Sequence, residues 1–307
     1  GIALDNIGNV YVTGSFGHLS GSSATFGTST ITSGGGKDVF VAKLSGSGSW
    51  QWVIGSGGTG SEQGNGISTD SNGNSYICGD FLGATSFGST SLTNHDVNAD
   101  VFVAKVSTTG AWQWATGAGG DHYDSCRQIM VDSSGGSYIT GNFISSQMNF
   151  SSISLMRSTS GWWGTDLFVA KLNNTGDWQW AIRAGNPSNA DFTTGFDIAI
   201  SSSRLVYVVG FFGNTVKFGD IIVTSGAMTD VFIAALSPDH DGDSSADVTD
   251  TDDDDDGVPD TSDGCRVGEL DWVSNSTTDH DSDGCVDDSS EDMDDDNDGL
   301  SDSADDC

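Results

Sequence analysis

The chain has 307 residues and a formal net charge of −34, from 10 basic and 44 acidic side chains. A polyanion of this size is repelled by phosphate backbones and anionic lipid, which excludes nucleic-acid binding. Glycine supplies 43 residues but proline only 3, so the composition stays below the level typical of disordered chains and permits a folded protein.

The charge divides the chain into two regions. Residues 237–307 hold 28 acidic residues and a single base, Arg266, whereas residues 1–236 hold 16 acidic and 9 basic residues. We therefore predict two domains, 1–236 and 237–307. No run of 18 apolar residues occurs, so we expect no membrane-spanning helix. Gly1 falls inside a predicted strand with no initiator Met or signal peptide, so we expect the chain to be processed or cut from a longer one.

Residues 1–236 repeat one pattern four times. A Tyr-x-x-Gly phrase is followed by an Asp-x-Phe-x-Ala phrase and, in three units, by Trp-x-Trp. These phrases are short, alternating and bounded by Gly, Asn, Asp and Ser, which predicts strands joined by tight turns and no helix. In the first unit the predicted elements are residues 1–5, 10–14, a hairpin at 26–27, 38–44 and 50–54. The repeated phrases begin at Tyr11, Tyr76, Tyr138 and Tyr207, then at Asp38, Asp100, Asp166 and Asp230, and then at Trp50, Trp112 and Trp178.

Repeats of about 64 residues with about four strands are typical of β-propeller blades, so we predict an all-β, propeller-like array. A four-stranded sheet cannot bury both faces alone, and neighbouring units must therefore stack, with the Trp pairs supplying buried area. The phrases resemble the SBBP-type β-propeller repeat family over residues 1–236. That resemblance implies a propeller fold and a secreted or cell-surface location, without an assigned chemistry.

The fourth unit departs from this pattern. Ser201 replaces the turn aspartate of the other units, and the phrase that begins at Asp230 runs into Ser237-Pro238 with no Trp-x-Trp. Its blade should therefore have an open edge, which proteins normally cover. We expect residues before Gly1 or another subunit to supply the missing strand, which would make this edge an assembly joint.

The acidic region repeats the spacing of a calcium-binding loop. Ca²⁺ takes six to eight oxygen ligands, and carboxylates at positions 1, 3, 5, 9 and 12 with glycine at position 6 can surround one ion. Segments 252–265 and 294–307 match each other fully, segment 279–287 keeps the first half, and segment 239–247 has Ser244 in place of the glycine. The predicted ligands of several Ca²⁺ ions are Asp239, Asp241, Asp243, Asp247, Asp252, Asp254, Asp256, Asp260, Asp263, Asp279, Asp281, Asp283, Asp287, Asp294, Asp296, Asp298, Asp302 and Asp305.

The intervals between the loops leave no room for the flanking helices of EF-hands or dockerins. The region instead resembles thrombospondin type 3 repeats over residues 239–307, which implies a ribbon held by calcium ions and disulfides rather than by an apolar core. The alternative is a solvated acidic tail without ordered metal.

The five cysteines indicate an oxidising compartment. Cys265 and Cys285 are candidate partners, and Cys307 could pair with a residue outside this sequence or with another molecule. Cys78 and Cys126 could join adjacent blades, although sequence does not fix connectivity. Sequons at Asn149, Asn173 and Asn275 would suit glycosylation of an exported protein.

No catalytic motif is found, and we predict that the chain is not an enzyme. The carboxylates of Asp38, Asp100, Asp166 and Asp230 recur in every unit, and Lys43, Lys105 and Lys171 recur in three of the four, which favours structural roles. We predict an extracellular, calcium-binding structural or adhesive surface protein that builds a filament or layer through the fourth-unit edge or Cys307. The alternative is a propeller that binds or processes surface glycans, with Trp162 and Trp163 stacking on sugars and the acidic region as a spacer.

Overall fold

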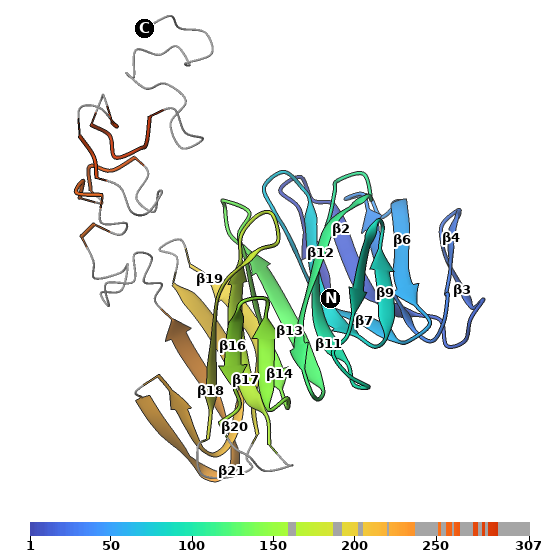
Figure 1. Ribbon diagram of the computed structural model, residues 1–307. Helices are drawn as coiled ribbons and strands as arrows, with labels where there is room; N and C mark the ends of the chain where they lie inside the picture. Colours follow the sequence, from blue (N-terminus) through green and yellow to red (C-terminus); the bar gives the residue numbers. More distant parts are fainter. Residues whose placement is uncertain are drawn as a thin grey trace, which may run out of the picture. The chain divides into compact units, whose positions relative to one another are not determined.

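Figure 1 shows a computed structural model of the chain. The structure describes residues 1–158, 164–186, 192–201, 205–219 and 221–236, followed by 251–252, 256–259, 261–264, 273–275, 278–279 and 282–287. The chain divides into two compact units, one of Gly1–Ile200 with Tyr207–Ala234 and one of Ser201–Val206 with Ala235–Cys307. In the described residues every named element is a strand, and none of them is a helix long and apolar enough to cross a membrane.

The first three repeat units share one arrangement, in which four antiparallel strands form a sheet and a hairpin projects from it between the second and third strands (Figure 1). The first unit contains β1 (Ile2–Leu4), β2 (Val10–Phe16), the hairpin β3 (Ser23–Phe26) and β4 (Ser29–Thr32), β5 (Asp38–Leu44) and β6 (Trp50–Gly58). The second contains β7 (Glu62–Thr69), β8 (Ser75–Phe81), the hairpin β9 (Ala84–Phe87) and β10 (Thr90–Thr93), β11 (Asp100–Val106) and β12 (Trp112–Gly120). The third contains β13 (Asp124–Val131), β14 (Ser137–Phe143), the hairpin β15 (Gln147–Phe150) and β16 (Ile153–Met156), β17 (Asp166–Leu172) and β18 (Trp178–Gly185). The all-β, propeller-like prediction is therefore confirmed.

Turn chemistry explains why the first two strands of a unit meet. Asp70 Oδ1 accepts the backbone N–H groups of Asn72 and Asn74, at 3.0 and 2.8 Å. Gly73 between them has φ of 80°, a conformation that a residue with a Cβ rarely adopts. Asp5 and Asp132 make the corresponding bonds in the first and third units.

From the second unit onward, each hairpin pairs with the unit before it. The last residues of β6 pair with β9 through Gly57 and Ser86, and the ends of β12 and β18 pair in the same way with β15 and β20. The hairpin of the first unit, β3 and β4, forms a sheet of its own with no third described strand. The sheets are thus linked in series by these short pairings.

The fourth unit has fewer strands, β19 (Thr193–Ile200), β20 (Val206–Phe218) and β21 (Ile221–Leu236), and the last two are longer than their counterparts. β20 continues without a break from the second strand into the hairpin, and β21 continues from the hairpin into the third strand. β20 is the one described strand that pairs with β21. In the described part of the chain, β21 has no strand on its other side.

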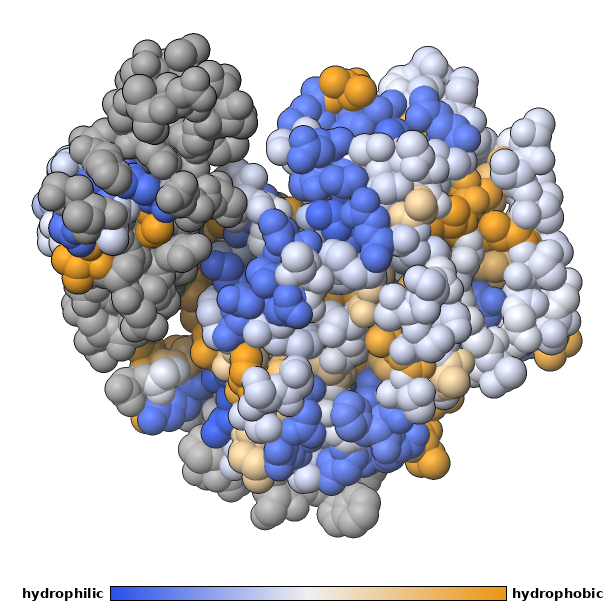
Figure 2. All heavy atoms as spheres, turned by 45° about the horizontal axis from the view of Figure 1, so that its top comes forward, coloured by the Kyte–Doolittle hydropathy of each residue, from blue (hydrophilic) through white to orange (hydrophobic). Residues whose placement is uncertain are grey.

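The apolar core lies between the sheets. One cluster combines Val39 and Val41 of the first unit with Ile67 and Phe102 of the second, and another joins the second and third units in the same way. Each Trp-x-Trp serves two partners, since Trp50 contacts Phe26 of the hairpin at 5.0 Å between ring centroids and Trp52 contacts Tyr11 at 6.0 Å. The face drawn in Figure 2 is mostly hydrophilic or neutral, with hydrophobic side chains in separate patches.

Candidate functional site

The aspartate that recurs at the start of each third strand closes a loop. Asp38, Asp100, Asp166 and Asp230 each accept a backbone N–H from an earlier residue, namely Gly34, His95, Ser158 and Gly226, at 2.6 to 2.9 Å. The same bond in all four units supports the predicted structural role of these carboxylates.

The recurring lysine is also accounted for by packing. Lys43 lies over the ring of Tyr11 with its Nζ 4.8 Å from the centroid, and Lys105 and Lys171 lie over Tyr76 and Tyr138 in the same way. A cation over an aromatic face stabilises the pair. These lysines therefore belong to the repeat architecture.

A feature that sequence reasoning missed is a pair of acidic residues at each of the first two junctions between units. Glu62, the first residue of β7, is buried beside Asp38, and its Oε2 accepts the Gly58 N–H at 3.3 Å. Burial and, to a lesser extent, the Asp38 charge raise the pKa of Glu62 to about 7. Asp38 Oδ1 and Glu62 Oε1 are both buried.

At the second junction Asp124, the first residue of β13, takes the position of Glu62. Burial raises its pKa to about 7, and the nearby Asp100 charge acts in the same direction. The Ser145 hydroxyl donates to Asp124 Oδ2 at 2.8 Å, and His95 Nδ1 lies 2.5 Å from Asp100 Oδ2. Aligning Glu62 and Asp124 across the repeats would have revealed the shared position.

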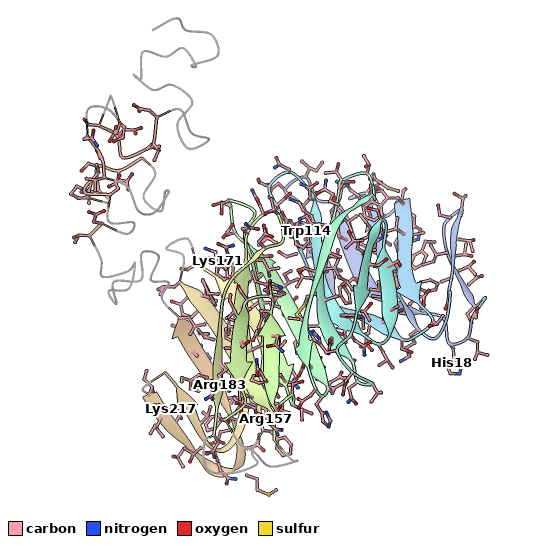
Figure 3. The ribbon with its side chains drawn as sticks, viewed as in Figure 1. His18, Trp114, Arg157, Lys171, Arg183 and Lys217 are labelled. Carbon is pink, nitrogen blue, oxygen red and sulfur yellow. A yellow bond between two sulfur atoms is a disulfide. The ribbon has the colours of Figure 1, made fainter. Side chains whose placement is uncertain are left out.

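At the third junction a threonine stands in place of the second carboxylate, and basic side chains lie near Asp166. Thr193 takes the position of Glu62, and the Arg183 Nη1 lies 3.5 Å from Asp166 Oδ2. Burial raises the pKa of Asp166, although hydrogen bonds from Ser158 and the charges of Arg183 and Arg157 act in the opposite direction. Figure 3 shows the two arginines at the same end of the third unit, far from His18.

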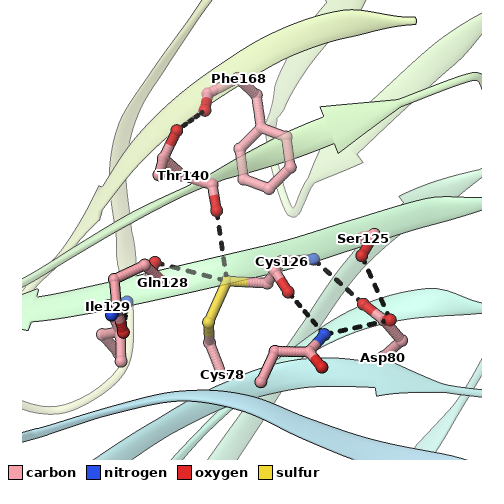
Figure 4. The surroundings of a disulfide bond; sticks show 9 residues. Cys78, Asp80, Ser125, Cys126, Gln128, Ile129, Thr140 and Phe168 are labelled. Atoms are coloured by element: carbon pink, nitrogen blue, oxygen red, sulfur yellow. Dashed lines mark hydrogen bonds between the residues drawn. A yellow bond between two sulfur atoms is a disulfide. The ribbon is translucent and has the colours of Figure 1, made fainter. Parts of the chain in front are cut away.

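A disulfide between Cys78 and Cys126 joins β8 to β13 and so connects the second unit to the third, as predicted (Figure 4). Asp80 lies beside it and accepts hydrogen bonds from the backbone of Cys126 at 3.1 Å and the hydroxyl of Ser125 at 3.2 Å. Burial raises the pKa of Asp80 to about 6 despite these bonds.

In the acidic region two of the predicted calcium loops have the same local geometry. The position-6 glycines, Gly257 and Gly284, have φ of 95° and 88°. Each donates its N–H to the position-1 carboxylate, Asp252 or Asp279, at 3.2 Å. The sharp turn that the spacing requires at glycine is therefore present in both.

The position-5 carboxylates are matched as well. Asp256 Oδ1 accepts the Val258 N–H at 2.6 Å, and Asp283 Oδ1 accepts the Cys285 N–H at 3.0 Å. The two loops touch, because the Gly264 N–H donates to the Asp283 carbonyl oxygen at 2.5 Å.

Two carboxylates in these loops, Asp256 and Asp279, are buried. Burial opposes ionisation of Asp279, but hydrogen bonds from Ser274 and from the backbone of Gly284 and Asp283 leave its pKa below its usual value. Asp279 is thus an ionised, buried oxygen donor, which suits a hard cation such as Ca²⁺.

Of the predicted calcium ligands, Asp252, Asp256, Asp263, Asp279, Asp283 and Asp287 are described. Among the described residues no three acidic, histidine or cysteine side chains converge in a geometry that could hold a metal ion. Carboxylates spaced around a glycine turn still fit the oxygen chemistry of calcium. The predicted ligands that lie outside the described residues are Asp239, Asp241, Asp243, Asp247, Asp254, Asp260, Asp281, Asp294, Asp296, Asp298, Asp302 and Asp305.

Only some of the remaining predicted sites lie in the described residues. Cys285 takes part in a disulfide, whereas Cys265, Cys307, Trp162 and Trp163 lie outside the described residues.

The three predicted glycosylation asparagines are described, and each uses its side chain locally. Asn149 Oδ1 accepts from Ser154 at 2.9 Å, Asn173 Oδ1 accepts the Asp177 N–H at 2.9 Å, and Asn275 Nδ2 donates to Val273 at 2.8 Å. Asn275 is the exposed one of the three.

Comparison with known proteins identifies no family for this chain. No protein-family model and no curated protein matches the chain. Among solved structures, the crystal structure of a protein of unknown function from Bacteroides caccae is similar over 73% of this chain and 60% of that chain, with 12% sequence identity and a TM-score of 0.33. The chain thus spans less than two thirds of that structure's length.

Proposed function

We propose that this chain is an extracellular, calcium-binding structural or adhesive protein that takes part in building a surface assembly such as a filament or layer. The observation that carries the calcium part is the repeated geometry of the two loops at Gly257 and Gly284. In both, the position-1 carboxylate accepts the glycine N–H and the position-5 carboxylate accepts the next N–H. A single loop of this kind could arise by chance, but two loops with matched hydrogen bonds favour a shared role in calcium binding.

The charge of the region supports the same proposal. With 28 acidic residues and one base in residues 237–307, the segment carries a self-repulsion that would keep it unfolded unless cations neutralise it. The resemblance to thrombospondin type 3 repeats offers bound calcium as that cation.

The repeat domain supports a structural role and an extracellular location. Its repeated carboxylates and lysines serve loop closure and ring packing, and its disulfide is of the kind that persists in oxidising compartments. The resemblance to SBBP-type repeats implies the same location.

Calcium titration of the whole chain tests the proposal. Extracellular modules bind calcium with dissociation constants of about 10⁻⁴–10⁻³ M, so calorimetry at millimolar calcium should show saturable binding by the chain. Asp252→Asn and Asp279→Asn each remove a position-1 ligand, and each should weaken one site about tenfold or more.

Asp177→Asn is the matched control, because it makes the same charge change at an exposed turn of the repeat domain. Equal binding by all three variants, or no binding by the parent chain, would contradict the calcium proposal.

A further inference from the structure

The repeat units contact one another through two different faces. We call the face of a unit that packs on the next unit its trailing face, and the face that receives the previous unit its leading face. The Tyr11 hydroxyl of the first unit donates to the Gly73 carbonyl of the second at 2.8 Å. Trp52 and Trp114 reach forward in the same way, donating through Nε1 to the carbonyls of Thr108 and Asn174 at 3.0 and 3.1 Å. One type of heterologous interface thus recurs along the array.

The leading face of the first unit has no described partner. Ile2 is 71% exposed, whereas its counterparts Ile67, Ile129 and Ile198 are 4, 0 and 2% exposed. The space beside Gly8 is open, whereas its counterpart Gly73 lies against the Tyr11 hydroxyl. Burial at this position therefore depends on a preceding unit, not on the residue type.

The trailing face of the fourth unit is uncovered to the same degree. Val231 and Ile233 in β21 are 84 and 76% exposed. The corresponding pairs in the other units, Val39 with Val41, Val101 with Val103 and Leu167 with Val169, are at most 3% exposed. Tyr207, the counterpart of Tyr11, is 38% exposed although Tyr11 itself is fully buried.

The trailing face of the fourth unit is also more apolar than the three internal trailing faces. Val209 stands where the other units have Thr13, Cys78 and Thr140. Phe211 stands where they have Ser15, Asp80 and Asn142, and it packs on the half-exposed Phe196 at 5.2 Å between ring centroids. Terminal units of repeat proteins normally carry a polar outer face for solubility. This one has the opposite composition, which is typical of a face that becomes buried.

We propose that the trailing face of the fourth unit binds the leading face of the first unit in a second copy of this chain, head to tail. The inference rests on the assembly role proposed above and locates its joint. Three internal junctions of the same chain already show that faces of these two kinds fit each other. Because the joint is heterologous, repetition adds copies in one direction.

The joint is weaker than the internal junctions. The fourth unit has no Trp-x-Trp, so Gly48 at the leading face receives no indole, whereas its counterparts Gly110 and Gly176 lie against Trp52 and Trp114. The edge of β3 likewise receives no strand from a fourth unit of this kind. Assembly should therefore depend on protein concentration.

Sedimentation velocity of the 307-residue chain across a hundredfold concentration range tests the joint, with calcium and with chelator. Ile2→Asp charges the leading face and Ile233→Asp charges the trailing face. Val97→Asp is the control, since Val97 is 85% exposed in a loop of the second unit and lies on neither end face. Circular dichroism checks that each variant is folded.

The parent chain and Val97→Asp should form larger species as concentration rises, and each face variant alone should stay monomeric. An equimolar mixture of Ile2→Asp and Ile233→Asp should form a one-to-one complex that grows no further, because it contains one intact joint.

A parent chain that is monomeric at every concentration overturns the inference, as does a single face variant that still dimerises. If both face variants assemble like the parent, assembly uses other surfaces of the chain. That result would overturn the proposed joint but not the assembly role. A parent chain that assembles but binds no calcium would contradict the calcium proposal alone.

Discussion

At the scale of single residues, the buried carboxylates at the first two junctions have raised pKa values. Glu62 and Asp124 have pKa values raised to about 7, in both cases chiefly by burial. A carboxyl group whose pKa is higher in the folded than in the unfolded chain holds a proton in the folded state that the unfolded state releases. Its contribution to stability is therefore complete at low pH and is lost as pH rises from about 4.5 to 7.

We expect the repeat domain to be less stable at pH 8 than at pH 5. Each unit of pKa difference corresponds to about 1.4 kcal/mol, so Glu62 alone accounts for a loss on the order of 2 kcal/mol. Glu62→Gln keeps the shape without the charge and should flatten this dependence, raising the urea midpoint at pH 8 with little change at pH 5.

Asp177→Asn serves as the control for this change. Hydrogen bonds from Thr175 and Asn173 lower the pKa of the exposed Asp177 carboxyl, so its titration lies below the range of interest. Parallel pH profiles for Glu62→Gln and the parent chain would show that folding does not raise the pKa of Glu62 and that its carboxyl is already ionised in the folded state at pH 5.

At the scale of strands and turns, the sequence predicts what is local and repeated. The phrases at Tyr11, Asp38 and Trp50 have the right alternation and turn residues, and β2, β5 and β6 form there. The pairing of each hairpin with the preceding unit was not predictable, because it rests on two backbone pairs such as Gly57 with Ser86, which no side-chain pattern marks. The carboxylate pairs were missed for a related reason, since Glu62 and Asp38 meet only when two units stack.

The disulfide is the element-scale feature that was predicted and can be tested by substitution. At the other two junctions the corresponding positions are Thr13 against Gly64 and Thr140 against Gly195. Cys78→Thr combined with Cys126→Gly therefore copies a junction that the fold already uses.

The double variant should fold but lose stability, because the bond closes a loop across a sequence separation of 48. Loop-closure entropy for a loop of that length gives about 4 kcal/mol as an upper figure, and about 2–4 kcal/mol is typical. The urea midpoint followed by tryptophan fluorescence measures the loss. An unchanged midpoint would mean that β8 and β13 are held together without help from the disulfide.

At the scale of the whole molecule, two compact units with different physics share one chain. The unit made mainly of repeats buries Val, Ile, Phe and Trp side chains between sheets. The other unit contains the acidic loops, whose buried groups are carboxylates such as Asp256 and Asp279. A hydrophobic core needs no metal, whereas a buried carboxylate that stays ionised needs hydrogen bonds, a charged partner or a bound cation.

We therefore expect two separate thermal transitions that respond differently to calcium. Calcium at a hundredfold excess over its dissociation constant stabilises a site by about 2.7 kcal/mol, so the transition of the acidic unit should move upward with calcium and disappear in chelator. The transition of the repeats should stay in place, because its core holds no predicted calcium ligand. Calorimetry separates the two, and hydrogen exchange assigns them, with protection of residues 251–287 lost in chelator and protection of β8, β11 and β14 retained. A single transition that shifts as a whole would show instead that the two units unfold together and that calcium stabilises the repeats through the acidic region.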